Sequence, residues 1–83
     1  MTRDEILRGI ETVARTHLQW SGELTPELGL IEDLELDSLG LLTLAVEVEN
    51  HFRICLEEED EAKIHTVADL VTVIERKLGD SPV

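Results

Sequence analysis

The stretch from residue 37 to residue 52 reads DSLGLLTLAVEVENHF, and it decides the fold of this chain. Apolar residues recur in it at the spacing i, i+3, i+4, i+7 and i+11, which is the pattern of an amphipathic helix. The residues that form this stripe are Leu41, Leu44, Ala45, Val48 and Phe52. Asp37 immediately precedes the pattern, and aspartate is a preferred N-cap residue. We therefore predict a helix over residues 38–52.

Segments near the two ends predict further helices. Thr2 and Glu5 have the spacing of a capping box ahead of an apolar repeat, which predicts a helix over about residues 3–18. Thr66 is the corresponding cap for a second repeat, which predicts a helix over residues 67–78. Both helices have an apolar stripe to bury.

The remaining segments predict less regular structure. Residues 57–61 are five successive acids, which repel one another, so we expect only a short helix at about residues 57–63. Residues 19–36 contain Gly and Pro but also five leucines and an isoleucine, which predicts a long loop packed across the helices. The predicted class is all-α. A single domain over residues 1–83 forms a small four-helix bundle, with three principal helices, one short helix and a long loop between the first two.

The net charge of -12 is concentrated in the middle of the chain. Residues 16–62 hold thirteen acids and Arg53 as their only base, whereas the two ends together are neutral. Such a charge repels a phosphate backbone, and Trp20 and Phe52 are the only aromatic residues, so we exclude nucleic-acid binding. The acidic middle has two interpretations. It is either a solvated face that keeps a small protein soluble or a field that guides basic patches on partner proteins.

Several other classes of function lack the residues that they need. Cys55 is the only cysteine, and the chain has no signal-peptide core and no membrane-spanning run, so we expect a cytoplasmic protein. A calcium loop starting at Asp33 has Ser38 where the turn needs glycine, and three scattered histidines with one cysteine make no zinc site. Ser38 also lacks the Gly-x-Ser-x-Gly context of a hydrolase. We therefore expect no metal site and no enzyme activity.

Ser38 is the one residue whose position suggests a chemical role. It opens the predicted helix over residues 38–52, where backbone N–H groups lack internal partners and the helix dipole places partial positive charge. Such a position holds a phosphate well. The hypothesis that follows is a phosphate-linked group attached at Ser38.

The surroundings of Ser38 resemble those of the acyl carrier proteins. An acidic, leucine-rich run at residues 31–36 leads into Asp-Ser-Leu at residues 37–39, the next helix closes on Phe52, and residues 64–70 open the last helix. These parts occur in order over essentially the whole chain. The resemblance implies that Ser38 receives a covalent phosphopantetheine arm from coenzyme A, through a separate phosphopantetheinyl transferase that uses magnesium. The thiol of that arm would carry acyl groups as thioesters.

The resemblance also implies roles for other residues. Asp37 would cap the helix and help the transferase engage, and Leu39 would be an apolar contact. Partner recognition would involve Leu39, Leu42, Val46, Glu47 and Glu49, with the glutamates meeting basic patches on acyl-transferring and condensing enzymes. The space that receives the acyl chain would be lined by Leu44, Val48, Phe52, Leu56, Ile64, Leu70 and Ile74. We expect a monomer that does not insert into membranes.

Four positions depart from the pattern of a fatty-acid carrier. Gly40, Thr43, Asn50 and His51 stand where acids are common, so the recognition face is more apolar. Gly40 in a first helical turn costs up to about 1 kcal/mol against alanine, and it suggests close approach by a partner. The run at residues 37–42 is closer to discrete carriers of polyketide or other specialised pathways.

Some alternatives stay open at this point. Leu42 and Val46 lie outside the predicted buried stripe, so they belong either to a wide core stripe or to an exposed ridge with Leu39. An aminoacyl or peptidyl carrier shares the same motif, and an unmodified helical interaction module would use the ridge alone. The start at Met1 favours a discrete protein over an excised domain.

Overall fold

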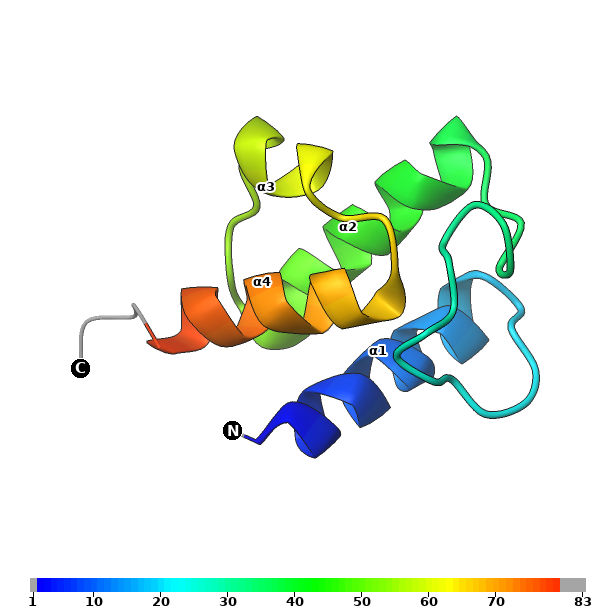
Figure 1. Cartoon of the computed structure of the whole chain (residues 1–83), viewed down its shortest axis with the longest axis horizontal. Coiled ribbons are helices and arrows are strands. Elements are labelled where there is room, and N and C mark those ends of the chain that lie inside the picture. The colour runs from blue at the N-terminus through cyan, green and yellow to red at the C-terminus, as the bar shows by residue number, and fades with distance from the viewer. Residues whose placement is uncertain (1, 80–83) are drawn as a thin grey trace.

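The structure is a computed structural model that describes residues 2–79. Four helices lie in this range. They are α1 (Arg3–His17), α2 (Ser38–Phe52), α3 (Glu58–Ala62) and α4 (Val67–Gly79), arranged as in Figure 1. The predicted all-α class, with three principal helices, one short helix and a long first loop, is confirmed. The bounds of α2 are as predicted. By contrast, α1 ends one residue earlier, α3 is one residue shorter at each end, and α4 is one residue longer.

Side-chain caps fix where α1 and α4 begin. The Thr2 hydroxyl accepts a hydrogen bond from the Glu5 N–H at 3.2 Å, and the Glu5 carboxylate accepts one from the Thr2 N–H at 3.1 Å. Before α4, the Asp69 carboxylate accepts from the N–H groups of His65 and Thr66 at 3.0 and 3.1 Å. These two bonds favour the charged carboxylate and so lower the pKa of Asp69. Both helix starts therefore follow from residue types that the sequence displays.

The core is assembled on α1. This helix packs against α2 and α4 (Figure 1) and buries an apolar stripe between them. The core cluster consists of Ile6, Ile10, Val13, Leu24, Leu30, Leu44, Val48, Phe52, Val67, Leu70, Val71 and Ile74. The short helix α3 buries no residue and sits on the side of α2 and α4 away from α1 (Figure 1). It therefore covers the bundle without belonging to its core.

The long loop between α1 and α2 is tied to the start of α4. The Leu30 N–H donates to the His65 carbonyl at 3.0 Å, and the Val67 N–H donates to the Leu28 carbonyl at 2.9 Å. Leu24 and Leu30 are each only 2% exposed, which confirms that leucines of the loop help to complete the core. The anchored loop sets where the chain enters α2, and hence where Ser38 lies.

Candidate functional site

Ser38 is the first residue of α2, and it is exposed. Asp37 caps the helix with an extended backbone, and its carboxylate accepts a hydrogen bond from the Gly40 N–H at 2.7 Å. The Asp37 carbonyl accepts from the Leu41 N–H at 2.9 Å. The N–H groups of Ser38 and Leu39 come before any helical acceptor. Together with the helix dipole, they place partial positive charge beside the Ser38 hydroxyl.

Gly40 makes room for this cap. A Cβ atom at Gly40 would lie 3.3 Å from Asp37 Oδ1 and 3.3 Å from Leu36 Cδ2. Both separations are shorter than the optimal contact distance between non-bonded heavy atoms, so a side chain would push the two residues away. The structure therefore gives Gly40 an internal purpose. Close approach by a partner at this residue stays a prediction.

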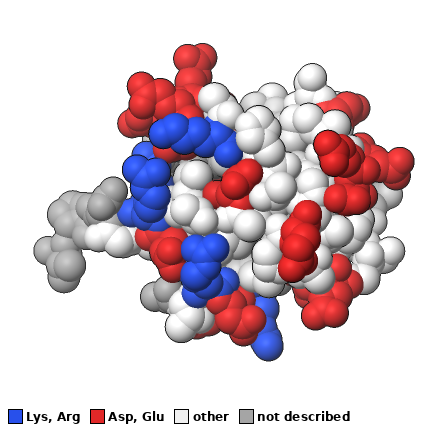
Figure 2. Space-filling model, viewed as in Figure 1, with Lys and Arg blue, Asp and Glu red and all other residues white. Residues whose placement is uncertain are grey.

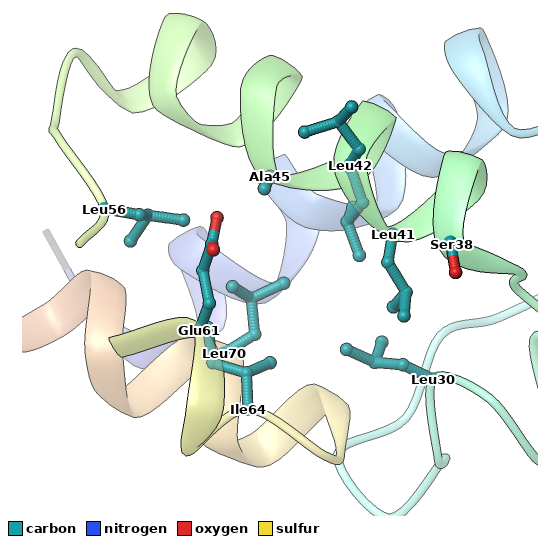
Figure 3. A pocket seen from close by; sticks show the side chains of 10 residues that line it. Leu30, Ser38, Leu41, Leu42, Ala45, Leu56, Glu61, Ile64 and Leu70 are labelled. Carbon is teal, nitrogen blue, oxygen red and sulfur yellow. The ribbon is translucent and has the colours of Figure 1, made fainter. Parts of the chain in front are cut away.

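A pocket of about 330 Å³ opens beside Ser38 (Figure 3). One wall comes from α2, the opposite side comes from α3 and the connections that flank it, and α4 and the long loop add one residue each. The lining residues are Leu30, Ser38, Leu41, Leu42, Leu44, Ala45, Leu56, Glu61, Ile64 and Leu70. In Figure 3, Ser38 lies at one end and Glu61 lies toward the other. Every other lining side chain is apolar, so the pocket suits an alkyl group.

The residues predicted to line an acyl chain fall into two groups. Leu44, Leu56, Ile64 and Leu70 line the pocket. Val48, Phe52 and Ile74 lie instead in the core cluster. The Phe52 ring faces α1, where a Cβ atom on Gly9 would be 2.5 Å from its Cζ atom. The structure thus brings only the first group together beside Ser38.

Five lining residues were missed by the sequence reasoning: Leu30, Leu41, Leu42, Ala45 and Glu61. Those on α2 stand three, four and seven positions after Ser38, which places them on the same helical face. Counting from Ser38 would therefore have found them. Leu41 and Ala45, predicted to be buried with the main stripe, are only half-buried because they border this pocket.

Three apolar side chains form an exposed ridge along α2. Leu39 is 71% exposed, Leu42 is 58% exposed and Val46 is 42% exposed. Their spacing of i, i+3 and i+7 places them on one face of the helix. The wide-core interpretation of Leu42 and Val46 is therefore wrong, because these side chains form an exposed ridge with Leu39. The use of this ridge in binding partners stays a prediction.

The two glutamates expected to meet partners make contacts within the molecule. The Glu47 carboxylate lies 3.3 Å from His17 Nε2, which links α2 to the end of α1. The Glu49 carboxylate accepts a hydrogen bond from the Leu56 N–H at 2.8 Å, which helps to close the turn after α2. Both side chains therefore have a structural purpose in the free protein.

Acids and bases are unevenly spread over the surface, although acids also pair with bases at the ends of α1 and α4. In Figure 2 the acids gather over α3 and over the side that carries the long loop, and most bases lie where α1 begins and α4 ends. Lys77 of α4 reaches Asp60 of α3 at 2.9 Å, and this contact raises the pKa of Lys77 and lowers that of Asp60.

Within residues 2–79, no group of three potential metal-ligating side chains comes together. None of the helices in the same range is long and apolar enough to cross a membrane.

Comparison with known proteins agrees with this geometry. Residues 8–74 match the family model described as the phosphopantetheine attachment site. An acyl carrier protein of Thermotoga maritima is 37% identical, over 94% of this chain and 98% of that protein. The chain belongs to the acyl carrier protein family. The meromycolate extension acyl carrier protein of Mycobacterium leprae is 34% identical, over 99% of this carrier and 72% of that protein.

Solved structures share the fold of this carrier. A candidate acyl carrier protein from Mycobacterium tuberculosis superposes with a TM-score of 0.80 at 30% identity, over 86% of this chain and 96% of that one. The acyl carrier protein of Thermotoga maritima superposes with a TM-score of 0.78 at 25% identity, over 94% of this chain and 92% of that one. The prosthetic group of the family is phosphopantetheine. The exposed Ser38 hydroxyl, the open helix N-terminus and the adjacent apolar pocket fit a phosphate-linked arm with an apolar cargo.

Proposed function

We propose that Ser38 is the attachment residue and that this chain carries acyl groups between enzymes without itself catalysing their reactions. The observation that supports this most is an exposed hydroxyl at the first position of α2, at the end of an apolar pocket. In the attachment reaction, Ser38 Oγ bonds to the pantetheine-bearing phosphorus of coenzyme A, adenosine bisphosphate leaves, and the hydroxyl proton passes to a base on the transferase. Once attached, the arm supplies a thiol for thioester formation.

Asp37 and the start of α2 hold the attachment point in place. Because Asp37 bonds the Gly40 N–H, it fixes the first turn and keeps its own carboxylate beside Ser38. The N–H groups of Ser38 and Leu39 are available to the phosphodiester, whose negative charge is favoured at a helix N-terminus. We propose that the transferase recognises this turn together with Leu39.

The pocket is proposed to shelter the acyl chain. A group the size of a water molecule occupies about 30 Å³, so the pocket of about 330 Å³ has room for on the order of ten methylenes. Each buried methylene contributes about 0.8 kcal/mol, so a medium alkyl chain is retained whereas a short polar group is not. The proposed lining consists of Leu44, Leu56, Ile64 and Leu70 together with the missed residues. Val48, Phe52 and Ile74 would support it from the core.

The ridge of Leu39, Leu42 and Val46 is proposed as the centre of the surface that meets the transferase and the acyl-transferring and condensing enzymes. Basic patches on these partners would face the acids around it. Glu47 and Glu49 would contribute only by exchanging their internal contacts for contacts with a partner. The exposed, free Cys55 thiol supports a cytoplasmic location. The narrowness of the ridge supports a monomer.

An alkyl cargo is favoured over an aminoacyl cargo because the pocket is apolar. The relatives include general acyl carriers and meromycolate extension carriers, and both names support an acyl cargo. The pathway is proposed only as fatty-acid, polyketide or another specialised acyl synthesis.

Mass spectrometry tests the attachment. The protein is incubated with coenzyme A, Mg²⁺ and a broad-specificity phosphopantetheinyl transferase, and it should gain the mass of one arm. Ser38→Ala should gain none, whereas Ser21→Ala, which removes an exposed hydroxyl from the long loop, should be modified normally. If several transferases add nothing to the wild-type chain, or if Ser38→Ala is still modified, the proposal fails. Equal partner binding by the unmodified chain and Ser38→Ala would support an interaction module instead.

A further inference from the structure

Glu61 is the one charged side chain in the lining of the pocket. It belongs to the last turn of α3, and Figure 3 shows its carboxylate directed toward α2, between Leu56 and Ala45. Ala45, the α2 residue that Figure 3 shows on one side of this carboxylate, has a small side chain. A group entering from Ser38 between α2 and α3 would pass this carboxylate.

The carboxylate of Glu61 has hydrogen-bonding capacity that the fold does not use. Two nearby acids are engaged: Asp60 pairs with Lys77 at 2.9 Å, and Glu49 accepts from the Leu56 N–H at 2.8 Å. Within residues 2–79, the Glu61 carboxylate takes part in no hydrogen bond or ion pair. The residue is exposed in the free protein.

A saturated alkyl chain in the pocket would remove water from this carboxylate and give no donor in return, which is unfavourable for a charged group. A chain that carries a hydroxyl group would replace that water with a charge-assisted hydrogen bond, the stronger kind. Sites that offer an acceptor to a ligand hydroxyl discriminate against the analogue that lacks it. The amide N–H groups of the pantetheine arm are common to both cargoes, so they do not affect this comparison.

We propose that Glu61 makes the pocket selective for acyl groups that carry a hydroxyl group within reach of its carboxylate, over saturated chains of equal length. The inference rests on the proposed function, because it assumes that cargo attached at Ser38 enters this pocket. Since the carboxylate keeps some contact with solvent, the expected preference is modest, about three- to tenfold.

The test compares two cargoes on three proteins. Wild type, Glu61→Ala and Glu59→Ala are loaded with octanoyl or 3-hydroxyoctanoyl groups, and the rate of thioester cleavage by hydroxylamine is measured. In wild type the hydroxylated cargo should be cleaved about three- to tenfold more slowly than the saturated one. Glu61→Ala should lose or reverse this difference. Glu59→Ala removes the same charge from an exposed position of α3 outside the lining, and it should behave as wild type.

An equal ratio of the two cleavage rates in wild type and Glu61→Ala would overturn the inference. Loss of the difference between the two cargoes in Glu59→Ala would also overturn it.

If Ser38 accepts no arm, the proposed function fails separately, and a non-covalent comparison still tests Glu61. The unmodified protein is titrated with 1-heptanol and with 1-methoxyhexane, which has similar size but no donor, while amide chemical shifts are followed. The alcohol should bind more tightly to wild type and lose that advantage in Glu61→Ala. Equal affinities in wild type would overturn the inference.

Discussion

Replacing Gly9 by alanine tests how α1 and α2 are packed. A glycine inside a helix normally costs about 1 kcal/mol relative to alanine, so the change would be stabilising on an open surface. Here the new Cβ atom would lie 2.5 Å from Phe52 Cζ, 3.0 Å from Phe52 Cε1 and 3.1 Å from His51 Nε2. The first separation is about 1 Å short of an optimal carbon–carbon contact. Because Phe52 is only 7% exposed, its ring has little room to retreat.

Overpacking of this kind typically costs about 1–3 kcal/mol, which outweighs the gain in helix propensity. We expect Gly9→Ala to lower the free energy of unfolding by up to about 2 kcal/mol, measured by urea denaturation with far-UV circular dichroism. In a Phe52→Leu background the obstacle is smaller, and the same substitution should become stabilising by up to about 1 kcal/mol. Gly79→Ala is the control without a clash, because a Cβ atom there meets nothing within 4 Å; at the last residue of α4 it should be neutral or stabilising by less than about 1 kcal/mol.

A stabilising effect of Gly9→Ala in the wild-type background would refute this reasoning. It would mean that the Phe52 ring can move away from Gly9 at little cost, so that its buried position does not hold it against α1.

Three further predictions concern the ends of helices. Asp37→Ala removes the 2.7 Å hydrogen bond to the Gly40 N–H and should lower the free energy of unfolding by about 1 kcal/mol, measured by urea denaturation. Asp37→Asn should recover most of this loss. An unchanged urea midpoint in Asp37→Ala would contradict the capping role. Arg53 ends α2 with a left-handed backbone conformation, at φ 57°. Arg53→Gly should therefore raise the free energy of unfolding by about 0.5–1 kcal/mol, whereas Arg53→Ala should not. Equal changes in stability for the two variants would argue against backbone strain at this residue. Hydrogen bonds from the His65 and Thr66 N–H groups lower the pKa of Asp69, so the charged carboxylate contributes stability above its unfolded pKa, and this contribution is lost as the pH falls through the lower, folded value. Wild type should therefore exceed Asp69→Asn in melting temperature at neutral pH and converge with it in acid, and a gap independent of pH would contradict the assignment.

The helices could be predicted because their signals are local. Thr2, Asp37 and Thr66 mark helix starts by residue type alone, and the bounds differ from the structure by at most one residue. Left-handed residues were not predictable in the same way. Glu35 and Arg53 adopt φ values of 55° and 57° where glycine would have been the signal. At Arg53 this conformation accompanies a local helix end, in which the N–H groups of Arg53 and Ile54 both donate to the Glu49 carbonyl.

The pocket could be predicted only in part, because α2 is apolar on more than one face. Periodicity shows that Leu44, Val48 and Phe52 share a stripe, but it does not show that the stripe turns from the pocket toward α1 along its length. That turn depends on where α1 crosses α2, which is a tertiary feature. The internal contacts of Glu47 and Glu49 were hidden for the same reason, since their partners lie on other segments.

The placement of α3 bears on the proposal that this small carrier shelters an acyl chain without a deep cavity. Only Leu44, Leu70 and Leu30 among the pocket residues are core residues, and the remaining apolar lining is half-buried or exposed. Because α3 buries no residue of its own, its displacement exposes little apolar surface and so costs little. An alkyl chain that fills the space beneath it gains burial on both walls. Cargo and fold should therefore stabilise each other, so that loading with a medium chain raises the melting temperature of the carrier.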